Sequence, residues 1–150
     1  MTESTASRVT IRPALASDYA AILALWRACG MNVKPDGRER KEAFEHQLTC
    51  FPGLYMVAVD GARIVGVVLG SHDQRKGWIS RLAVLPDYRR QGVATALVTA
   101  CDTALRVHGI EIVCALVEEG NQASARFFAS MGFESDVPVR YFRKLSHPGA

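Results

Sequence analysis

Two arginines and two small residues stand together in the segment Arg89-Arg90-Gln91-Gly92-Val93-Ala94, shortly after the apolar run Leu82–Leu85 and Pro86. The order predicts a strand, a turn at Pro86 and the start of a helix. The first amide groups of a helix lack internal partners and attract anions, and Gly92 and Ala94 let the backbone come close to an oxyanion. We interpret the segment as a pyrophosphate site. The alternative is a solvated helix start with chance arginines.

A second polar segment lies farther along the chain, at Gly120-Asn121-Gln122-Ala123. Asn121 is a good N-cap for a short helix that carries Phe127 and Phe128 and ends at Gly132.

The elements that must position these residues follow from hydrophobic periodicity. Strands are predicted over 8–12, 55–59, 63–70, 78–85 and 111–117, with a last antiparallel pair formed by a strand from Phe133 and another over 139–145. Helices are predicted over 19–29, 38–50 and 91–107 and after Asn121.

Two details of these elements matter for the site. Asp60-Gly61 predicts a type I′ hairpin turn. The nearly unbroken apolar run 111–117 predicts a buried, partly parallel strand. The strand over 78–85, its helix and the strand over 111–117 then form one crossover, which places the anion-binding helix start at the carboxyl end of a strand.

The two motifs resemble those of a known superfamily. The run from Leu82 to Leu97 is similar to motif A of the GCN5-related N-acetyltransferases (GNAT), a strand and Pro ahead of Arg/Gln-x-x-Gly-x-Gly/Ala. The run from Gly120-Asn121-Gln122-Ala123 to Phe127-Phe128 and Gly132-Phe133 resembles the second motif, Asn-x-x-Ala ahead of an aromatic pair and Gly-Phe, at the family's spacing. The resemblance implies an α/β fold of three layers (α/β/α), with a mixed, mostly antiparallel twisted sheet of about six to seven strands and four helices.

The resemblance also implies acetyl-CoA as co-substrate. The backbone amide of Leu82, freed by a strand bulge, would stabilise the oxyanion. The residues implied to contact acetyl-CoA are Leu82, Ala83, Val84, Arg89, Arg90, Gln91, Gly92, Val93, Ala94, Thr95, Asn121 and Phe128.

The chain departs from the family at its acid and base positions. Phe128 stands where many relatives carry a tyrosine acid, and Trp78 and Leu116 stand where some carry carboxylate bases. Tyr141 is a candidate acid, or else an edge-strand aromatic. Glu118 is a candidate base acting through water, or else part of a solvated turn.

Several residues are candidates for lining the pocket of the amine acceptor. Trp26, Trp78, Arg81 and Tyr55 are of the types that shape such a pocket, although aromatic residues at this spacing are more often core. The pair His72-Asp73 can bind an amine or take a proton, and the alternative there is loop chemistry.

Bulk properties limit the class of protein. We expect the 150 residues to form one domain, with 1–7 and 146–150 flexible. The net charge of +3 suits an anionic ligand without the clustered basic face of a nucleic-acid binder. No apolar run has the length of a membrane span and no signal core is present, so we expect a cytoplasmic protein with no membrane partner. The four cysteines lack metal-binding spacing, so no metal is expected.

Together these observations predict an N-acetyltransferase, a monomer or homodimer, that transfers the acetyl group of acetyl-CoA directly to a primary amine of a small molecule or peptide. The alternative is a CoA-binding regulatory module of the same fold with little or no turnover.

Overall fold

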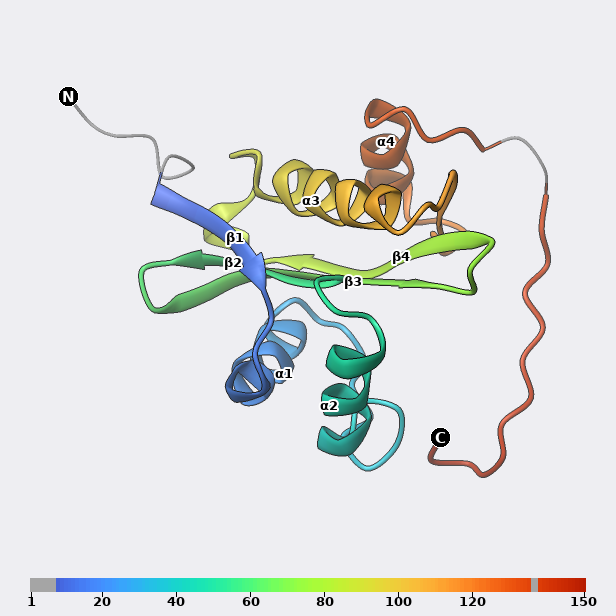
Figure 1. Ribbon diagram of the computed structural model, residues 1–150, viewed down its shortest axis with the longest axis horizontal. Coiled ribbons are helices and arrows are strands. Elements are labelled where there is room, and N and C mark those ends of the chain that lie inside the picture. The colour runs from blue at the N-terminus through green and yellow to red at the C-terminus, as the bar shows by residue number, and fades with distance from the viewer. Residues whose placement is uncertain (1–7, 136–137) are drawn as a thin grey trace.

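The computed structural model describes residues 8–135 and 138–150 (Figure 1). Within them, five strands form one sheet in the order β1-β2-β3-β4-β5. The strands are β1 (Val9–Pro13), β2 (Tyr55–Asp60), β3 (Arg63–His72), β4 (Lys76–Val84) and β5 (Ile112–Ala115). The helices are α1 (Tyr19–Ala28), α2 (Lys41–Cys50), α3 (Val93–Val107) and α4 (Gln122–Ser130), with short 3₁₀ turns η2 (Ala16–Asp18) and η3 (Pro86–Tyr88).

Helices cover both faces of the sheet. Helices α1 and α2 lie on one face, and α3 and α4 lie on the other (Figure 1). Each face has its own cluster of buried apolar residues, one against α3 and one against α1 and α2. The predicted three-layer α/β/α architecture with four helices is therefore confirmed.

Helix α3 shows why the periodicity was informative. Its apolar residues recur every fourth position, so they form one stripe along the helix. Val93, Leu97, Cys101 and Leu105 are all at most 3% exposed and pack on the sheet. The stripe fixes the rotation of α3, and with it the direction in which the first turn of the helix faces.

The pairing of β4 opens the sheet near its end. Strands β1 to β4 pair antiparallel, whereas β4 and β5 pair in parallel, as the predicted crossover requires. The parallel ladder joins only Lys76–Ile79 to Ile112–Ala115. Beyond Ile79, β4 continues without a β5 partner, so the two strands separate where the candidate site residues of β4 begin.

Three sequence predictions need correction here. The segment from Phe133 to Ser135 and the segment 138–145 pair with no strand of the described residues, so the described sheet has five strands and not six or seven. Alternation of apolar residues predicts which side chains share a face, but a strand also needs a partner edge, which alternation does not supply. The tail instead runs extended past the sheet, and its end lies beside Gly37 near α2 (Figure 1).

The other two corrections are local. Strand β5 is shorter than predicted and forms an edge, with Ile112 53% exposed, so its apolar run does not reflect burial in this structure. The β2–β3 turn has a positive φ at Gly61 but not at Ala62, the pattern of a type II′ turn and not type I′. No helix of the described residues is both long and apolar enough to cross a lipid bilayer.

Candidate active site

The start of α3 offers a row of free backbone donors. Arg90 and Gly92 both have left-handed backbone, with φ of +61° and +81°, which turns the chain sharply into the helix. No side chain caps α3, and its first backbone hydrogen bond runs from the Ala96 amide to the Gly92 carbonyl at 3.0 Å. Among the described residues, no acceptor takes the amide hydrogens from Arg90 to Thr95. Such a set of aligned N–H groups at a helix N-terminus is an anion-binding arrangement.

Side chains of the same segment hold its shape. Tyr88 is buried, Arg89 Nε donates to the Val84 carbonyl at 3.3 Å, and Gln91 Nε2 donates to the Asp87 carbonyl at 3.0 Å. Arg89 and Gln91 thus support the turn through their side chains. Arg90 is exposed beside the open amides and can supply charge to a bound anion.

Strand β4 contains the expected bulge. The ladder with β3 pairs Ser80 with Leu69 and Ala83 with Val67, which leaves Arg81 and Leu82 with no partner residue on β3. Arg81 has a φ of +55°, an uncommon conformation for a residue with a side chain. Its carbonyl accepts a hydrogen bond from Trp26 Nε1 at 3.1 Å, so α1 helps to hold the strained backbone.

The bulge borders a pocket at the separation of β4 and β5, which we name the edge pocket. Its volume is about 160 Å³. It is lined by Ile79, Ser80, Arg81, Leu82, Leu116, Val117, Glu118, Asn121, Ser124 and Phe128. Leu82, Glu118, Asn121 and Phe128, four of the site residues expected from the sequence, thus line one pocket.

Ser80 and Ser124 also line the edge pocket, and sequence reasoning missed both. Asn121 Oδ1 accepts from the Ser124 amide at 3.1 Å, which confirms the predicted cap and fixes Ser124 in the first turn of α4. The capping distance of three residues was the one signal that could have pointed to Ser124.

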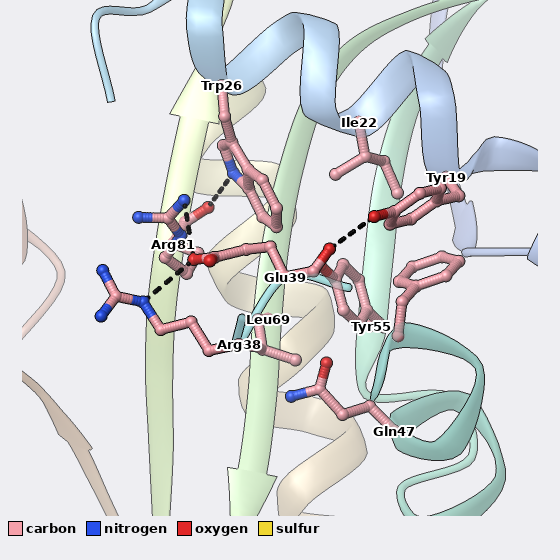
Figure 2. A pocket seen from close by; sticks show the side chains of 10 residues that line it. Tyr19, Ile22, Trp26, Arg38, Glu39, Gln47, Tyr55, Leu69 and Arg81 are labelled. Atoms are coloured by element: carbon pink, nitrogen blue, oxygen red, sulfur yellow. Dashed lines mark hydrogen bonds and ion pairs between the residues drawn. The ribbon is translucent and has the colours of Figure 1, made fainter. Parts of the chain in front are cut away.

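A second pocket lies between the sheet and helices α1 and α2, and we name it the aromatic pocket (Figure 2). Its volume is about 150 Å³. It is lined by Tyr19, Ile22, Trp26, Arg38, Glu39, Phe44, Gln47, Tyr55, Leu69 and Arg81. Trp26, Tyr55 and Arg81 were acceptor candidates from the sequence. Arg81 lines both pockets, so the bulge of β4 separates two adjoining spaces.

Glu39 is the buried acid of the aromatic pocket, and sequence reasoning missed it (Figure 2). Its carboxylate accepts from the Lys34 amide at 2.9 Å and from Arg38 Nε at 3.2 Å. Arg81 Nη2 lies 3.3 Å from the same carboxylate and donates to the Asn32 carbonyl at 2.8 Å. Burial lowers the pKa of Arg81, and the charge of Glu39 offsets part of that effect.

The tyrosines of the aromatic pocket are neutral. Burial raises the pKa of Tyr55 far above its usual value, and burial followed by nearby acidic charge raises that of Tyr19. The Tyr19 hydroxyl donates to the Glu39 carbonyl oxygen at 2.6 Å.

Other sequence candidates lie elsewhere. Tyr141 is 72% exposed on the unpaired tail and lines neither pocket, because the strand predicted to carry it does not form. Asp73 Oδ1 accepts from the amides of Arg75 and Lys76, and His72 packs against Phe51. Both His72 and Asp73 therefore stabilise the region of the β3–β4 turn. Trp78 lines neither pocket.

The cysteines of the described residues are free thiols. Burial raises the pKa of Cys101 to about 12, so this thiol stays protonated and is a poor nucleophile.

Comparisons with known proteins agree with this geometry. The family model described as "Acetyltransferase (GNAT) family" matches residues 19–133. The chain is 30% identical over 118 residues to an acetyltransferase of Pectobacterium atrosepticum, covering 79% of this chain and 82% of that protein.

Solved structures share the fold. The aminoglycoside acetyltransferase AAC(6')-Iy, solved with a CoA-containing bisubstrate analogue, has a TM-score of 0.77 at 20% identity, covering 91% of this chain and 98% of that one. The PaiA N-acetyltransferase from Thermoplasma acidophilum, solved with coenzyme A, has a TM-score of 0.72 at 16% identity, covering 85% of this chain and 91% of that one.

Proposed function

Because the chain belongs to the acetyltransferase (GNAT) family, an acetyl-CoA-dependent class of enzymes, we propose that it transfers the acetyl group directly to a primary amine. The observation that carries the proposal is the row of amides from Arg90 to Thr95 that donate to no described acceptor. They lie at the turn that follows β4, and β4 itself forms a wall of the edge pocket. A diphosphate at the amides therefore leaves room for its attached arm to run along the free edge of β4.

The donor set suits CoA. Backbone amides at a helix start bind phosphate oxygens, and exposed Arg90 adds a cation. The edge of β4 beyond Ile79 has no β5 partner, so an amide-containing chain can pair with Leu82 and Val84 as an added strand. Asn121 and Phe128 line the far side of the same pocket.

Acetyl-CoA supplies an activated thioester, and an amine attacks its carbonyl carbon. We assign the oxyanion donor to the Leu82 amide, which the bulge leaves without a partner residue on β3. The rate gain comes mainly from holding two reactants in line and from this donor. No nucleophilic cysteine is needed.

Proton transfer relies on few groups. Glu118 lines the edge pocket and can accept the amine proton through water. Phe128 offers no proton to the leaving sulfur, and since a thiol has a pKa near ~8.5, its thiolate is a tolerable leaving group at neutral pH. Ser124 in the same pocket is a hydroxyl donor available to that sulfur.

Release of free thiol from acetyl-CoA, measured against a library of primary amines, tests the proposal. Amine-dependent thiol release together with the acetylated amine in the mass spectrum supports acetyl transfer. Tight CoA binding with no release for any amine would instead establish the regulatory module, which the three replaced family positions Phe128, Trp78 and Leu116 favour.

A further inference from the structure

The chemistry of the aromatic pocket specifies a class of acceptor. We propose that this pocket binds a zwitterionic amine, which carries a carboxylate and an apolar group about the size of a benzene ring. Its role as acceptor rests on the acetyl transfer proposed above, whereas its binding to the pocket does not.

The size of the pocket sets the apolar group. A cavity of about 150 Å³ lined by apolar side chains is known to hold benzene, and the aromatic pocket has about this volume. Ile22, Phe44 and Leu69 supply apolar walls, and the Phe44 and Tyr55 rings meet edge to face at 5.1 Å between centroids. An aliphatic or aromatic side group fits this space, and an extended sugar does not.

The charge of the pocket sets the second group. Its ionised lining side chains are Arg38, Arg81 and Glu39, which give a net charge of one positive. The Glu39 carboxylate is 8% exposed and already receives the Lys34 amide and the two arginines. It therefore offers little to a substrate ammonium, although a buried acid in an aromatic pocket would by itself suggest a cation site.

Unused donors of the pocket point to an anion. Only Nη2 of Arg81 contacts the Asn32 carbonyl and the Glu39 carboxylate. Among the described residues, Nη1 donates to no acceptor. The Nε of Arg81 is also without an acceptor but is buried out of reach of a ligand, so Nη1 is the donor of this guanidinium that a ligand can use. Within the same described part of the chain, two other side chains that line the pocket, the Tyr55 hydroxyl and the Gln47 carboxamide, also make no hydrogen bond. A carboxylate can take these donors, whereas the one lining carboxylate is already paired and offers little to a polyamine or aminoglycoside.

The position of Arg81 also serves the reaction. Its guanidinium packs over the Trp26 ring with 4.4 Å between the Arg81 Cζ and the ring centroid, and its backbone adjoins Leu82, the assigned oxyanion donor. A like charge disfavours the ammonium form of an acceptor amine held nearby. The neutral, nucleophilic amine is then more populated, which suits a chain with Trp78 and Leu116 at two base positions.

Binding measured separately from turnover tests this inference. Calorimetric titration with L-phenylalanine, with and without CoA, gives a Kd that we expect on the order of 1 mM. The comparison ligands are 2-phenylethylamine, which lacks the carboxylate, a Phe-Gly dipeptide amide, and spermidine. Binding of phenylalanine at least about tenfold tighter than all three supports the inference. Equal or tighter binding of any of them overturns it.

Two pairs of variants locate the ligand. Arg38→Gln removes one charge from the rim of the pocket and should weaken phenylalanine binding about fivefold, while Arg40→Gln, an exposed neighbour that does not line the pocket, should not. Leu69→Trp should fill the pocket and abolish binding, whereas Leu69→Met keeps the volume and should retain it. Equal effects within either pair overturn the inference.

The readouts also separate the two proposals. CoA affinity is expected to be unchanged in Leu69→Trp, because the start of α3 lies on the opposite face of the sheet (Figure 1). Phenylalanine binding without thiol release would remove the enzymatic proposal and keep this one. If amines that lack a carboxylate release thiol as fast as amino acids do, the enzymatic proposal stands and the inference about the aromatic pocket is removed.

Discussion

Substitution of Gly92 by glutamate tests the anion site at the start of α3. Gly92 has a φ of +81°, and a Cβ at this position would meet nothing within 4 Å. The added carboxylate therefore enters the fold without a clash and lies beside the open amides. It competes with a phosphate for these donors and repels it.

The expected loss of acetyl-CoA affinity follows from the number of amide hydrogen bonds that the phosphate loses. A hydrogen bond to a charged group contributes about 1.5–3 kcal/mol, so loss of two amide bonds costs roughly 3–6 kcal/mol. This predicts that Gly92→Glu weakens acetyl-CoA binding by at least about 100-fold. Calorimetric titration of acetyl-CoA gives the value directly.

A matched control exists at the other end of the same helix. Gly109 follows α3 and has a φ of +83°, and a Cβ on this residue would also have no neighbour within 4 Å. In both variants the glutamate occupies left-handed backbone, which lowers the free energy of unfolding by the same amount, about 1–2 kcal/mol. The helix dipole favours the one at Gly92 and disfavours the one at Gly109 by about 0.3–1 kcal/mol each.

The two variants should therefore show opposite orders for stability and for binding. Urea unfolding should find Gly92→Glu more stable than Gly109→Glu, while only Gly92→Glu loses acetyl-CoA. Gly92→Ala has the backbone cost without the charge and should lose less affinity than Gly92→Glu. If Gly92→Glu binds acetyl-CoA within about threefold of the original chain, the amides do not hold the diphosphate.

Three further predictions concern catalysis, acid sensitivity and packing. Phe128→Tyr adds to the edge pocket a phenol, a stronger acid than the Ser124 hydroxyl, and should raise kcat by about threefold or more, and an unchanged kcat in a folded variant counts against a missing acid. Asp18 accepts from Arg12 at 2.7 and 3.0 Å, and this bond holds the pKa of Asp18 below its usual value. Asp18→Asn should therefore cost about 1.5–3 kcal/mol in urea unfolding at pH 7, and the gap should close as the pH falls below about 4 through the lowered pKa; a gap independent of pH would refute the assignment. A Cβ on Gly70 would lie 2.5 Å from Cys101 Sγ, so Gly70→Ala should destabilise by about 1–3 kcal/mol and Cys101→Ala should relieve part of this, whereas strictly additive losses in the double variant would show that this contact is not the cause.

The core elements and the open amides at the start of α3 followed from local pattern. The four-residue spacing in α3, the N-cap at Asn121 and the glycine that opens α3 each specify a local geometry, and the structure has all three. Elements that form only against a partner far away in the sequence were predicted less accurately. The strand expected over 139–145 has the right alternation, yet no edge of the described sheet pairs with it.

The charged pair of the aromatic pocket could not be predicted in the same way. Glu39 sits in a polar run ahead of α2, where a charged residue is ordinarily solvated. It is buried beside Arg81, 42 positions later, whose Nη2 lies 3.3 Å from the Glu39 carboxylate. Nothing in the local sequence around either residue encodes this pair.

By itself, the sequence determined the helix start that presents free amides, the crossover that places it at a strand end, and the family motifs, because these follow from hydrophobic spacing within each element and from backbone preferences at the turns. The tertiary structure alone decided where β4 separates from β5, that Arg81 lines two pockets, and that the Glu39 carboxylate among the aromatic side chains is already paired with two arginines. Those features arise from packing between segments far apart in the chain, and pairwise contact energies of that kind have no periodic signature in the sequence.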